Sequence, residues 1–312
     1  MDALFHPSSD RLLCCNEPPY NGQNYFVRNG EKHWIASIEF YSNGLFDASL
    51  VETVNAEETA SLPLSYPLCY PPGRLEDTNN FSEARAYLLQ HYRGKGVEFG
   101  AAAQPMPFPL GCHLTYADPF KVGEGCTTGY EGEFVPVHYQ TDLNHMQGLP
   151  DEAYDFLASA HSIEHTYDPI GVLSLAYRKL KPGGRFFLVV PHKEYTLDKP
   201  RATTSLRHLV EDYRQYNYER YVFDLMDFSE YAIFSDELYE TAHNWHNSRQ
   251  KYEAFLDGHG PDIHYHTFTE ESFAQLIDWY NANEKPWSDY TIWPVLDGKT
   301  DLLFEFWVEL VK

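Results

Sequence analysis

Short apolar segments recur through the middle of the chain, and each of them ends at polar or small residues. They span Val97–Phe99, His113–Ala117, Phe134–Tyr139, Tyr154–Ala158 and Arg185–Val190. Because these segments do not alternate cleanly between apolar and polar positions, both faces of each strand are expected to be covered. Strands of this kind separated by helical stretches predict a parallel sheet with helices on both sides.

Apolar positions at helical spacing predict three helices around these strands. The first runs from about Ser82 to Arg93 and ends at Gly94. Asp168 caps a second helix with Pro169 at its first position, and Thr269 opens a third with acidic residues in its first turn. The buried faces are expected to be Ile170, Leu173, Tyr177 and Leu180 in the second helix, and Phe273, Leu276, Ile277 and Tyr280 in the third.

The two ends of the chain have a different pattern. Residues 1–75 look irregular except for one predicted hairpin around Asn29-Gly30. The chain closes with Tyr290–Val295 and Leu302–Val311 on either side of a turn at Asp297-Gly298, which predicts an antiparallel hairpin.

These elements divide the chain into four parts. We expect an N-terminal extension at 1–80 and a core domain at 81–191. A mostly helical lid, with Leu206, Leu209, Val210 and Tyr213 on one stripe, follows at 192–266. Residues 267–312 complete the core with a helix and the terminal hairpin. The predicted fold is an α/β, Rossmann-like mixed sheet of seven strands with an N-terminal extension and a helical lid insert.

The formal charge of −23 makes nucleic acid a poor partner for this chain, because its field repels a phosphate backbone. No apolar run is long enough for a membrane span, and the N-terminus does not resemble a signal peptide. The five cysteines form no C-x-x-C pair, which indicates reduced thiols in a cytoplasmic protein. The sequence gives no oligomeric state.

One segment departs from this acidity. Residues 178–220 hold ten basic and five acidic side chains, against 13 and 41 in the rest of the chain. Lys193, Arg201 and Arg207 lie here and are candidates to bind an anionic acceptor. The alternative is a solvated helix face whose charges balance nearby acids.

Polar residues at successive strand ends carry the candidate chemistry. Gly100 permits a tight turn after the first apolar segment, and Ala101 and Ala102 allow close backbone approach. Asp118 ends the next segment, where a carboxylate can accept both hydroxyls of a ribose, and Asp142 ends the third. In an open parallel sheet, ligands bind at this edge.

The chain here resembles the class I S-adenosylmethionine-dependent methyltransferases, enzymes of the EC 2.1.1 group. The matching series is the turn at 97–103, Asp118, the run from Asp142 through Leu149-Pro150 to Asp155, His161-Ser-Ile-Glu164-His165, and Leu180-Lys-Pro-Gly-Gly-Arg185. It covers about 95–191, together with the terminal hairpin.

The resemblance implies S-adenosylmethionine as cofactor and assigns roles to its contacts. Glu98 and Gly100 lie beside the methionine moiety, Asp118 binds the ribose hydroxyls, and Asp142 and Leu143 contact adenine. The segment from Ser159 to His165 forms the floor on which the methyl group meets the acceptor.

The acceptor is expected to be a small molecule. Oxygen is the favoured receiving atom, on a sugar or a secondary metabolite, with nitrogen and carbon left open. A hydroxyl acceptor needs a base, and histidine suits neutral pH. The candidate catalytic residues are His165, His161, His192 and Glu164. Aromatic and histidine residues of the lid are candidates for a ring-stacking pocket, and they include Tyr216, Tyr218, Tyr221, His243, Trp245 and His246.

The chain departs from the family pattern after the glycine turn. Ala102 stands where the family has a second glycine, and Pro105, Pro107 and Pro109 disfavour a helix directly after the turn. A non-catalytic cofactor-binding or interaction protein that retains the fold is therefore an alternative hypothesis.

The letters His161-Ser-Ile-Glu164-His165 also match a zinc-peptidase motif, H-x-x-E-H, which needs both histidines on one face of a helix. Because the motif follows a predicted strand, we keep this as a remote alternative only. His264-Tyr-His266 has a chelating spacing, but we expect these to be surface or site residues, and we expect no metal ion.

Overall fold

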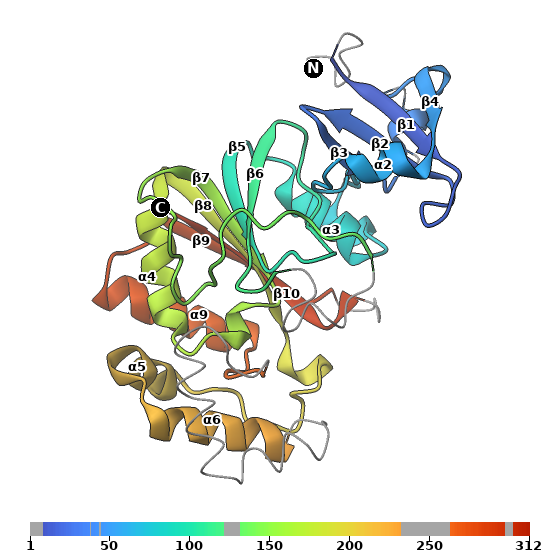
Figure 1. Cartoon of the computed structure of the whole chain (residues 1–312). Helices are drawn as coiled ribbons and strands as arrows, with labels where there is room; N and C mark the ends of the chain where they lie inside the picture. Colours follow the sequence, from blue (N-terminus) through green and yellow to red (C-terminus); the bar gives the residue numbers. More distant parts are fainter. Residues whose placement is uncertain (1–8, 38, 44, 122–131, 232–262, 297–301) are drawn as a thin grey trace. The chain divides into compact units, whose positions relative to one another are not determined.

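The computed structural model describes residues 9–37, 39–43, 45–121, 132–231, 263–296 and 302–312 (Figure 1). Contacts within the chain divide it into two compact units. The first unit comprises Met1–Gly94, Ala101–Leu114 and Tyr130–Pro136. The second comprises Lys95–Gly100, Thr115–Gly129 and Val137–Lys312.

A four-stranded sheet organises the first unit, with strand order β3-β2-β1-β4. The predicted hairpin is confirmed: β2 and β3 pair antiparallel, and Asn29 and Gly30 in the turn have φ of 56° and 83°. The rest of the stretch is not irregular, because β1 pairs antiparallel with β2 and parallel with β4. These strands are β1 (Arg11–Cys15), β2 (Gln23–Arg28), β3 (Glu31–Trp34) and β4 (Val51–Val54).

Short helices complete the first unit. Its α3 corresponds to the predicted helix after Ser82, and Asn80 caps it by accepting from the backbone N–H of Glu83. A pocket of about 500 Å³ lies in this unit, lined mostly by apolar residues that include prolines, leucines and aromatic rings. The helices are α1 (Glu39–Ser42), α2 (Ala56–Ser61) and α3 (Phe81–Leu89), with short 3-10 turns η1 (Ala48–Leu50) and η2 (Leu75–Asp77).

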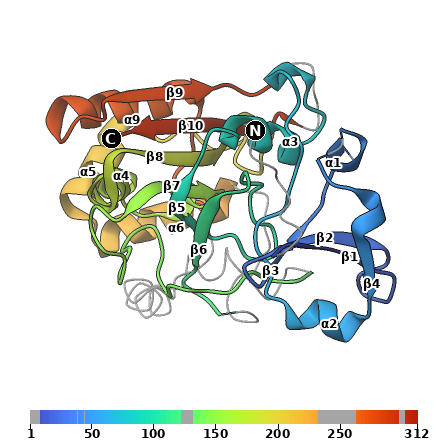
Figure 2. The ribbon, with the colours of Figure 1, turned by 90° about the horizontal axis from the view of Figure 1, so that it is seen from above.

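The second sheet of the chain is mixed and has six strands, in the order β6-β5-β7-β8-β10-β9 (Figure 2). Strand β7 pairs parallel with β5 and with β8, whereas β10 pairs antiparallel with β8 and β9. The terminal antiparallel hairpin is therefore confirmed in its strands, while its predicted turn at Asp297-Gly298 lies outside the described residues. The strands are β5 (Gly94–Phe99), β6 (Cys112–Ala117), β7 (Tyr154–Ala160), β8 (Leu180–Pro191), β9 (Asp289–Trp293) and β10 (Glu305–Val311).

The Rossmann-like α/β class is confirmed, but the count of seven strands is wrong for the described residues. The segment Phe134–Tyr139 forms no strand. It meets β6 through one isolated bridge, between Ala117 and Tyr139, and through hydrogen bonds between its last two residues and Tyr116. Pro136 lies inside the segment and has no backbone N–H, so a continuous ladder cannot form there.

The described residues of the second unit form four helices. The predicted caps are confirmed. Asp168 caps α4 with a side-chain oxygen 2.8 Å from the N–H of Gly171, and Thr269 caps α9, where Ser272 completes a reciprocal capping box. α4 packs on β8, and α5 contacts both α4 and α9. These helices are α4 (Pro169–Lys179), α5 (Leu206–Gln215), α6 (Tyr218–Tyr231) and α9 (Glu270–Asn283), with 3-10 turns η4 (Ile163–His165) and η5 (Lys193–Tyr195).

The described part of the insert is helical over α5 and α6, which lie together beyond the sheet (Figure 1), whereas residues 196–205 before them form turns and extended chain. Tyr221 is fully buried in a cluster that Tyr216 and Tyr218 also contact, so these rings build the insert's own core. The other predicted ring-stacking residues, His243, Trp245 and His246, lie outside the described residues. In the part of the chain that the structure describes, no helix is long and apolar enough to cross a membrane.

The described cysteines form no disulfide. Cys14, Cys15, Cys69 and Cys112 carry free thiols, and Cys126 lies outside the described residues. Burial raises the pKa of the Cys112 thiol to about 12, so this thiol stays protonated and acts as a small apolar side chain.

Candidate functional site

A tight turn follows β5 at the carboxyl edge of the sheet. Gly100 has φ of +70°, and its N–H donates to the carbonyl of Ala117 at the end of β6 over 3.0 Å. A β-carbon built on Gly100 would lie 2.8 Å from Oγ of Ser162, in the loop after β7. The turn therefore packs closely against the loop of the neighbouring strand, and glycine is required for both its conformation and its space.

The residues after Gly100 depart from the glycine-rich turn of the family, as the sequence indicates. Ala102 has φ of +46°, a left-handed conformation that is unfavourable for a residue with a β-carbon. No helix follows in the described part of this segment, which contains Pro105, Pro107 and Pro109. The polypeptide thus adopts the turn with alanine at a position that favours glycine.

Two buried polar side chains lie on adjacent strands near this turn. Glu98 on β5 pairs in register with Ala158, and Ser159 on β7 pairs with Phe99. Glu98 and Ser159 are each 1% exposed. Within the described residues, Oγ of Ser159 has no hydrogen-bond partner. A buried hydroxyl without a partner is unfavourable, so this edge of the sheet suits a polar ligand.

The two predicted acids after Gly100 have different surroundings. Asp118 is buried at the end of β6 and accepts a hydrogen bond from the N–H of Phe120, and its burial raises its pKa. The carboxylate of Asp142 accepts from His145 at both the backbone N–H, 3.0 Å, and Nδ1, 2.8 Å. Leu143 is buried in the apolar core. Asp118 thus retains acceptor capacity, whereas one oxygen of Asp142 is already engaged by His145.

An imidazole–carboxylate pair lies at the end of β7. His161 has φ of +49°, and its Nε2 is 2.9 Å from Oε2 of Glu305 on β10. Glu305 is fully buried, and its other oxygen accepts from Nε1 of Trp307 over 2.9 Å. The His161 side chain remains 31% exposed. Glu305, itself held by Trp307, therefore fixes Nε2 of His161, while the imidazole remains partly accessible.

The remaining residues of the H-x-x-E-H motif lie on the short turn η4. Oε1 of Glu164 is 3.6 Å from Nε2 of His165 and 3.9 Å from Nδ1 of His161. The motif is thus not on an α-helix, and it lacks the helical geometry that the zinc-peptidase reading needs. His264 joins the turn from a distant segment, with its ring 4.8 Å from that of His165.

A buried arginine holds this distant segment in place. Nδ1 of His264 bonds to Asp198, whose carboxylate also accepts from Nη1 of Arg201 over 2.7 Å. Arg201 is 3% exposed, and it also donates to the carbonyl of His264 and to Asp227. Its charge is therefore engaged inside the protein, which favours a positioning role over contact with an acceptor.

The other predicted acceptor-binding cations are also paired. Lys193 is buried and donates to Glu194, while Arg207 is exposed and pairs with Glu211 on its own helix at 2.7 Å. Since each of the three cations has its own carboxylate, they do not form one anion-binding cluster.

His192, a predicted catalytic residue, has both ring nitrogens engaged. Its Nε2 is 2.9 Å from Glu270 at the start of α9, and its Nδ1 accepts from the N–H of Glu194 over 3.2 Å. This arrangement joins the end of β8 to α9, and it favours a structural role for His192.

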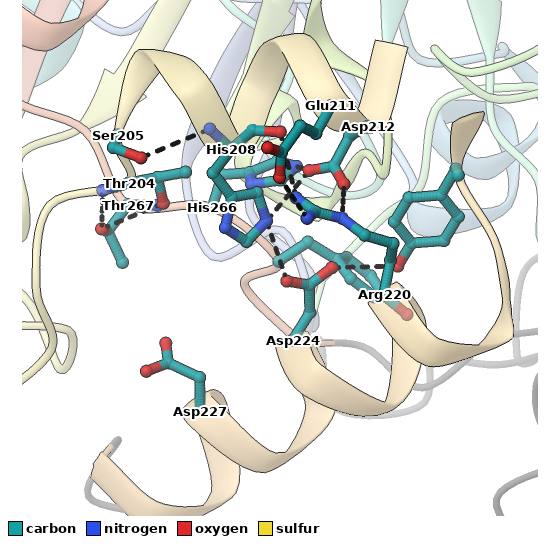
Figure 3. A network of polar contacts seen from close by, with 12 residues as sticks. Thr204, Ser205, His208, Glu211, Asp212, Arg220, Asp224, Asp227, His266 and Thr267 are labelled. Atoms are coloured by element: carbon teal, nitrogen blue, oxygen red, sulfur yellow. Dashed lines mark hydrogen bonds and ion pairs between the residues drawn. The ribbon is translucent and has the colours of Figure 1, made fainter. Parts of the chain in front are cut away.

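A second polar network joins α5 and α6 to the segment before α9 (Figure 3). His208 on α5 lies 3.0 Å from Asp212 and 3.2 Å from Asp224 on α6. Burial lowers the pKa of His208, but the two carboxylates outweigh this and raise it to about 9. Arg220 pairs with both Asp212 and Glu211, and Glu211 also pairs with Arg207. Three cations thus face three carboxylates, and the network is electrically balanced.

His266 completes this network, and it is buried rather than on the surface. It is fully inaccessible, and burial lowers its pKa to about 3, so the imidazole is neutral. Its Nε2 lies 3.8 Å from Asp212. The two histidines of His264-Tyr-His266 therefore belong to two different clusters.

Local sequence spacing did not reveal several of these partners. Glu305 is 144 residues from His161, and Asp198 is 66 residues from His264. His145 was detectable in principle, because it lies three residues after Asp142 on a turn.

The chain matches one family model, described as a methyltransferase domain, over residues 78–283. No curated protein matches it. Among solved structures, the chain is similar to an S-adenosylmethionine-dependent methyltransferase from Thermotoga maritima, named as a possible histamine N-methyltransferase. The identity is 16% and the TM-score 0.41, over 76% of this chain and 91% of the other.

Two further solved structures are similar. One is an S-adenosylmethionine-dependent methyltransferase from Methanosarcina mazei, with 14% identity and a TM-score of 0.39 over 72% of this chain and 95% of the other. The other is a plantazolicin methyltransferase in complex with S-adenosylhomocysteine, with 12% identity and a TM-score of 0.38 over 76% and 82%.

Proposed function

The chain belongs to the methyltransferase-domain family, and on this premise we propose that it methylates a hydroxyl of a small-molecule acceptor, such as a sugar or a secondary metabolite. S-adenosylmethionine is its cofactor. The observation that carries the proposal of an oxygen acceptor is the pair of His161 and Glu305 at the carboxyl edge of the sheet. An oxygen acceptor has a proton to lose, and this pair is suited to receive it.

The residues around the glycine turn fit the cofactor. Gly100 leaves space beside Ser162, Asp118 offers a buried carboxylate for ribose hydroxyls, and Ser159 offers an unsatisfied hydroxyl. Glu98 lies on the strand beside Ser159, where it can accept from the amino group of the methionine moiety. We assign these four residues to cofactor binding, together with the backbone of Ala101 and Ala102 and with Asp142 and Leu143.

The reaction is a displacement at carbon. When bound, S-adenosylmethionine supplies a sulfonium methyl group, whose carbon–sulfur bond breaks with its electron pair going to sulfur. The acceptor oxygen forms the new bond to carbon, and its proton passes to Nδ1 of His161. Glu305 holds the opposite nitrogen, which fixes the imidazole in place and stabilises its positive charge once it is protonated. The chain contributes mainly positioning and proton removal.

His161 is favoured over the other candidate bases on geometry. Both nitrogens of His192 are engaged, and His165 lies against Glu164 and His264 in a second cluster. We therefore assign the proton acceptor to His161 and give His165 and Glu164 a separate role.

Titration calorimetry with S-adenosylmethionine tests the cofactor assignment. We expect the wild-type chain to bind and Asp118→Ala to lose most of its affinity, while Asp289→Ala, an exposed acid on β9, binds as the wild type does. Equal affinity in Asp118→Ala and Asp289→Ala would contradict the assignment of Asp118.

Turnover separates the enzyme from a non-catalytic protein that retains the fold. The assay follows radiolabelled methyl transfer from S-adenosylmethionine to a panel of sugars, phenols and amines. Transfer to hydroxyl acceptors that is lost in His161→Ala supports the proposal. Transfer restricted to amines would contradict the oxygen acceptor, and cofactor binding without transfer to any acceptor would support the non-catalytic alternative.

A further inference from the structure

Glu164 is a buried carboxylate near the candidate site. Its side chain is 1% exposed, and neither carboxylate oxygen has a hydrogen-bond partner among the described residues. Its ion-pair neighbours in this part of the chain are the imidazoles of His165 and His161, at 3.6 and 3.9 Å. Burying an ionised carboxylate without a cation or a donor is strongly unfavourable. The position therefore indicates a cation that would compensate the charge.

Three ligand atoms already converge around this carboxylate. One atom each of Glu164, His165 and His264 lies within 4.8 Å of the other two. Zinc lies about 2.0–2.1 Å from imidazole nitrogen, so the ligand atoms of a tetrahedral site are roughly 3.3 Å apart. The contact between Glu164 and His165, at 3.6 Å, is close to this spacing.

The neighbourhood of His264 is typical of a metal-binding histidine. Its Nδ1 bonds to Asp198, which leaves Nε2 as the nitrogen available to a ligand site. Metal-binding histidines almost always direct their other nitrogen to a carboxylate or carbonyl in this way, which fixes the ring and increases its basicity. Asp198 is itself held by Arg201.

The backbone also fixes the segment that carries His264. The N–H groups of Tyr265 and His266 donate to the carbonyl of Glu164 over 2.8 and 3.3 Å. Two of the ligand residues are therefore joined by hydrogen bonds between the segments that carry them, although about one hundred residues separate them in sequence. Such pre-organisation reduces the entropy that metal binding must overcome.

The polar network around His208 differs from the Glu164 cluster in its charge balance. His208, Asp212 and His266 also bring three ligand atoms together within 4.8 Å. There, however, three cations, Arg207, Arg220 and the charged His208, already balance the three carboxylates of Glu211, Asp212 and Asp224. Among the described residues, Glu164 has no arginine or lysine partner, so of these two clusters it is the one that lacks a balancing cation there.

We propose that Glu164, His165 and His264 form a binding site for a divalent transition-metal ion such as Zn²⁺ or Mn²⁺. Two imidazoles and one carboxylate suit these ions better than Mg²⁺ or Ca²⁺, which prefer oxygen ligands. Three protein ligands leave a coordination position open. This changes the sequence-based expectation that the chain holds no metal ion.

The open position gives the site a role in the proposed reaction, and this role rests on the proposed function. Ser162, two residues before Glu164, lies against Gly100 of the cofactor turn. The metal would bind the acceptor oxygen and increase its acidity, as a Lewis acid does. His161, whose Nδ1 faces Glu164 at 3.9 Å, would then take the proton.

Metal titration of the chelator-treated protein tests the site without cofactor or acceptor. We expect Zn²⁺ and Mn²⁺ to bind with a stoichiometry of one per chain. Glu164→Gln and His264→Ala should weaken this binding more than about 100-fold. Asp198→Asn should weaken it about 10- to 100-fold, the range for residues that orient a metal-binding histidine. His113→Ala, an exposed histidine on β6, and His266→Gln, in the balanced network, should bind as the wild type does.

Co²⁺ absorption of the wild-type chain tests the site even if one of the variants does not fold. Co²⁺ should give visible absorption bands whose intensity indicates four- or five-coordination with nitrogen ligands, and Zn²⁺ should displace it. Absence of these bands, or binding that Glu164→Gln and His264→Ala leave unchanged, would overturn the site. Loss of methyl transfer on chelation, with unchanged affinity for S-adenosylmethionine, would support the role in acceptor binding. Metal binding that leaves transfer unaffected would overturn that role alone.

Discussion

The Oγ of Ser162 lies 2.8 Å from the point that a β-carbon on Gly100 would occupy, so these two residues bring the turn after β5 close to the loop after β7. Such a distance is shorter than real carbon–oxygen contacts. If residue 100 gains a side chain, the Ser162 hydroxyl must rotate away and lose its hydrogen bond to the carbonyl of Ala160, or one of the two segments must shift. Both segments belong to the proposed site.

Gly100→Ala should therefore weaken S-adenosylmethionine binding at least tenfold, as measured by calorimetry. Gly183→Ala is the matched control, because Gly183 also has a positive φ, +76°, but has no atom near its absent β-carbon. Each substitution should destabilise the fold by about 1–2 kcal/mol through backbone strain, and only the first should affect the cofactor. If Gly100→Ala/Ser162→Ala recovers no affinity, the contact with Ser162 is not the cause.

Glu305→Gln should lower kcat about 10²- to 10⁴-fold while leaving cofactor affinity unchanged. Trp307 Nε1–H donates to the other oxygen of Glu305, so the glutamine carbonyl must take that place. The glutamine NH₂ group then faces Nε2 of His161 and donates to it, which leaves the imidazole proton on Nδ1. That tautomer cannot accept the acceptor's proton. Single-turnover assays with a responsive acceptor measure the effect, and an unchanged kcat would contradict the assignment of His161.

Ala102→Gly should stabilise the fold by about 1 kcal/mol, because the residue has φ of +46° and glycine adopts this conformation without steric strain. The midpoint of thermal unfolding measures this. Ala103→Gly, at the next position, is the control and should destabilise the fold through its added freedom in the unfolded chain. A lower midpoint in Ala102→Gly would show that the alanine is not strained.

Arg201→Ala should destabilise the fold by about 3–5 kcal/mol, since it leaves the buried Asp198 without its arginine partner. Arg207→Ala should leave the unfolding midpoint unchanged, because Arg207 is exposed and pairs only with Glu211 in the described structure. Urea unfolding of both variants tests this contrast. If Arg201→Ala weakens only acceptor binding and leaves stability unchanged, Arg201 is an acceptor ligand after all.

The His208 network should make stability depend on pH. The pKa of His208 rises from 6.5 to about 9 on folding, so its contribution is fully present below pH 6.5 and is lost as pH rises through 9. The shift corresponds to roughly 3 kcal/mol at most. Asp212 and Asp224 face the ring, with Arg220 and neutral His266 beside them.

Urea unfolding of the wild-type chain and His208→Gln at pH 6.5 and pH 9.5 tests this dependence. At pH 6.5 the wild-type chain should have a larger free energy of unfolding than His208→Gln. At pH 9.5 this difference between the two proteins should be smaller. A difference that stays constant between the two values would show that the protonated His208 does not stabilise the network.

Local patterns were sufficient for elements whose residues interact with near neighbours. The caps at Asp168 and Thr269 act within one turn, and the Asn29-Gly30 turn joins adjacent strands, so these features were predictable. The segment around Pro136 was not, because its apolar residues resemble a strand while its missing N–H prevents the ladder. The first unit was mistaken for an irregular stretch because its strands of four to six residues carry little periodicity.

The sequence by itself determined the α/β class, the family, and the candidate residues at the carboxyl edge of the sheet, because turns and strand ends are encoded by neighbouring residues. Only the tertiary structure decided what those residues can do. It set Glu305 beside His161 and His264 beside Glu164, and it engaged Arg201 with buried acids. Charge and hydrogen bonding act through space over a few ångströms, so side chains separated by a hundred or more residues determine which groups accept a proton, bind a ligand or stabilise the fold.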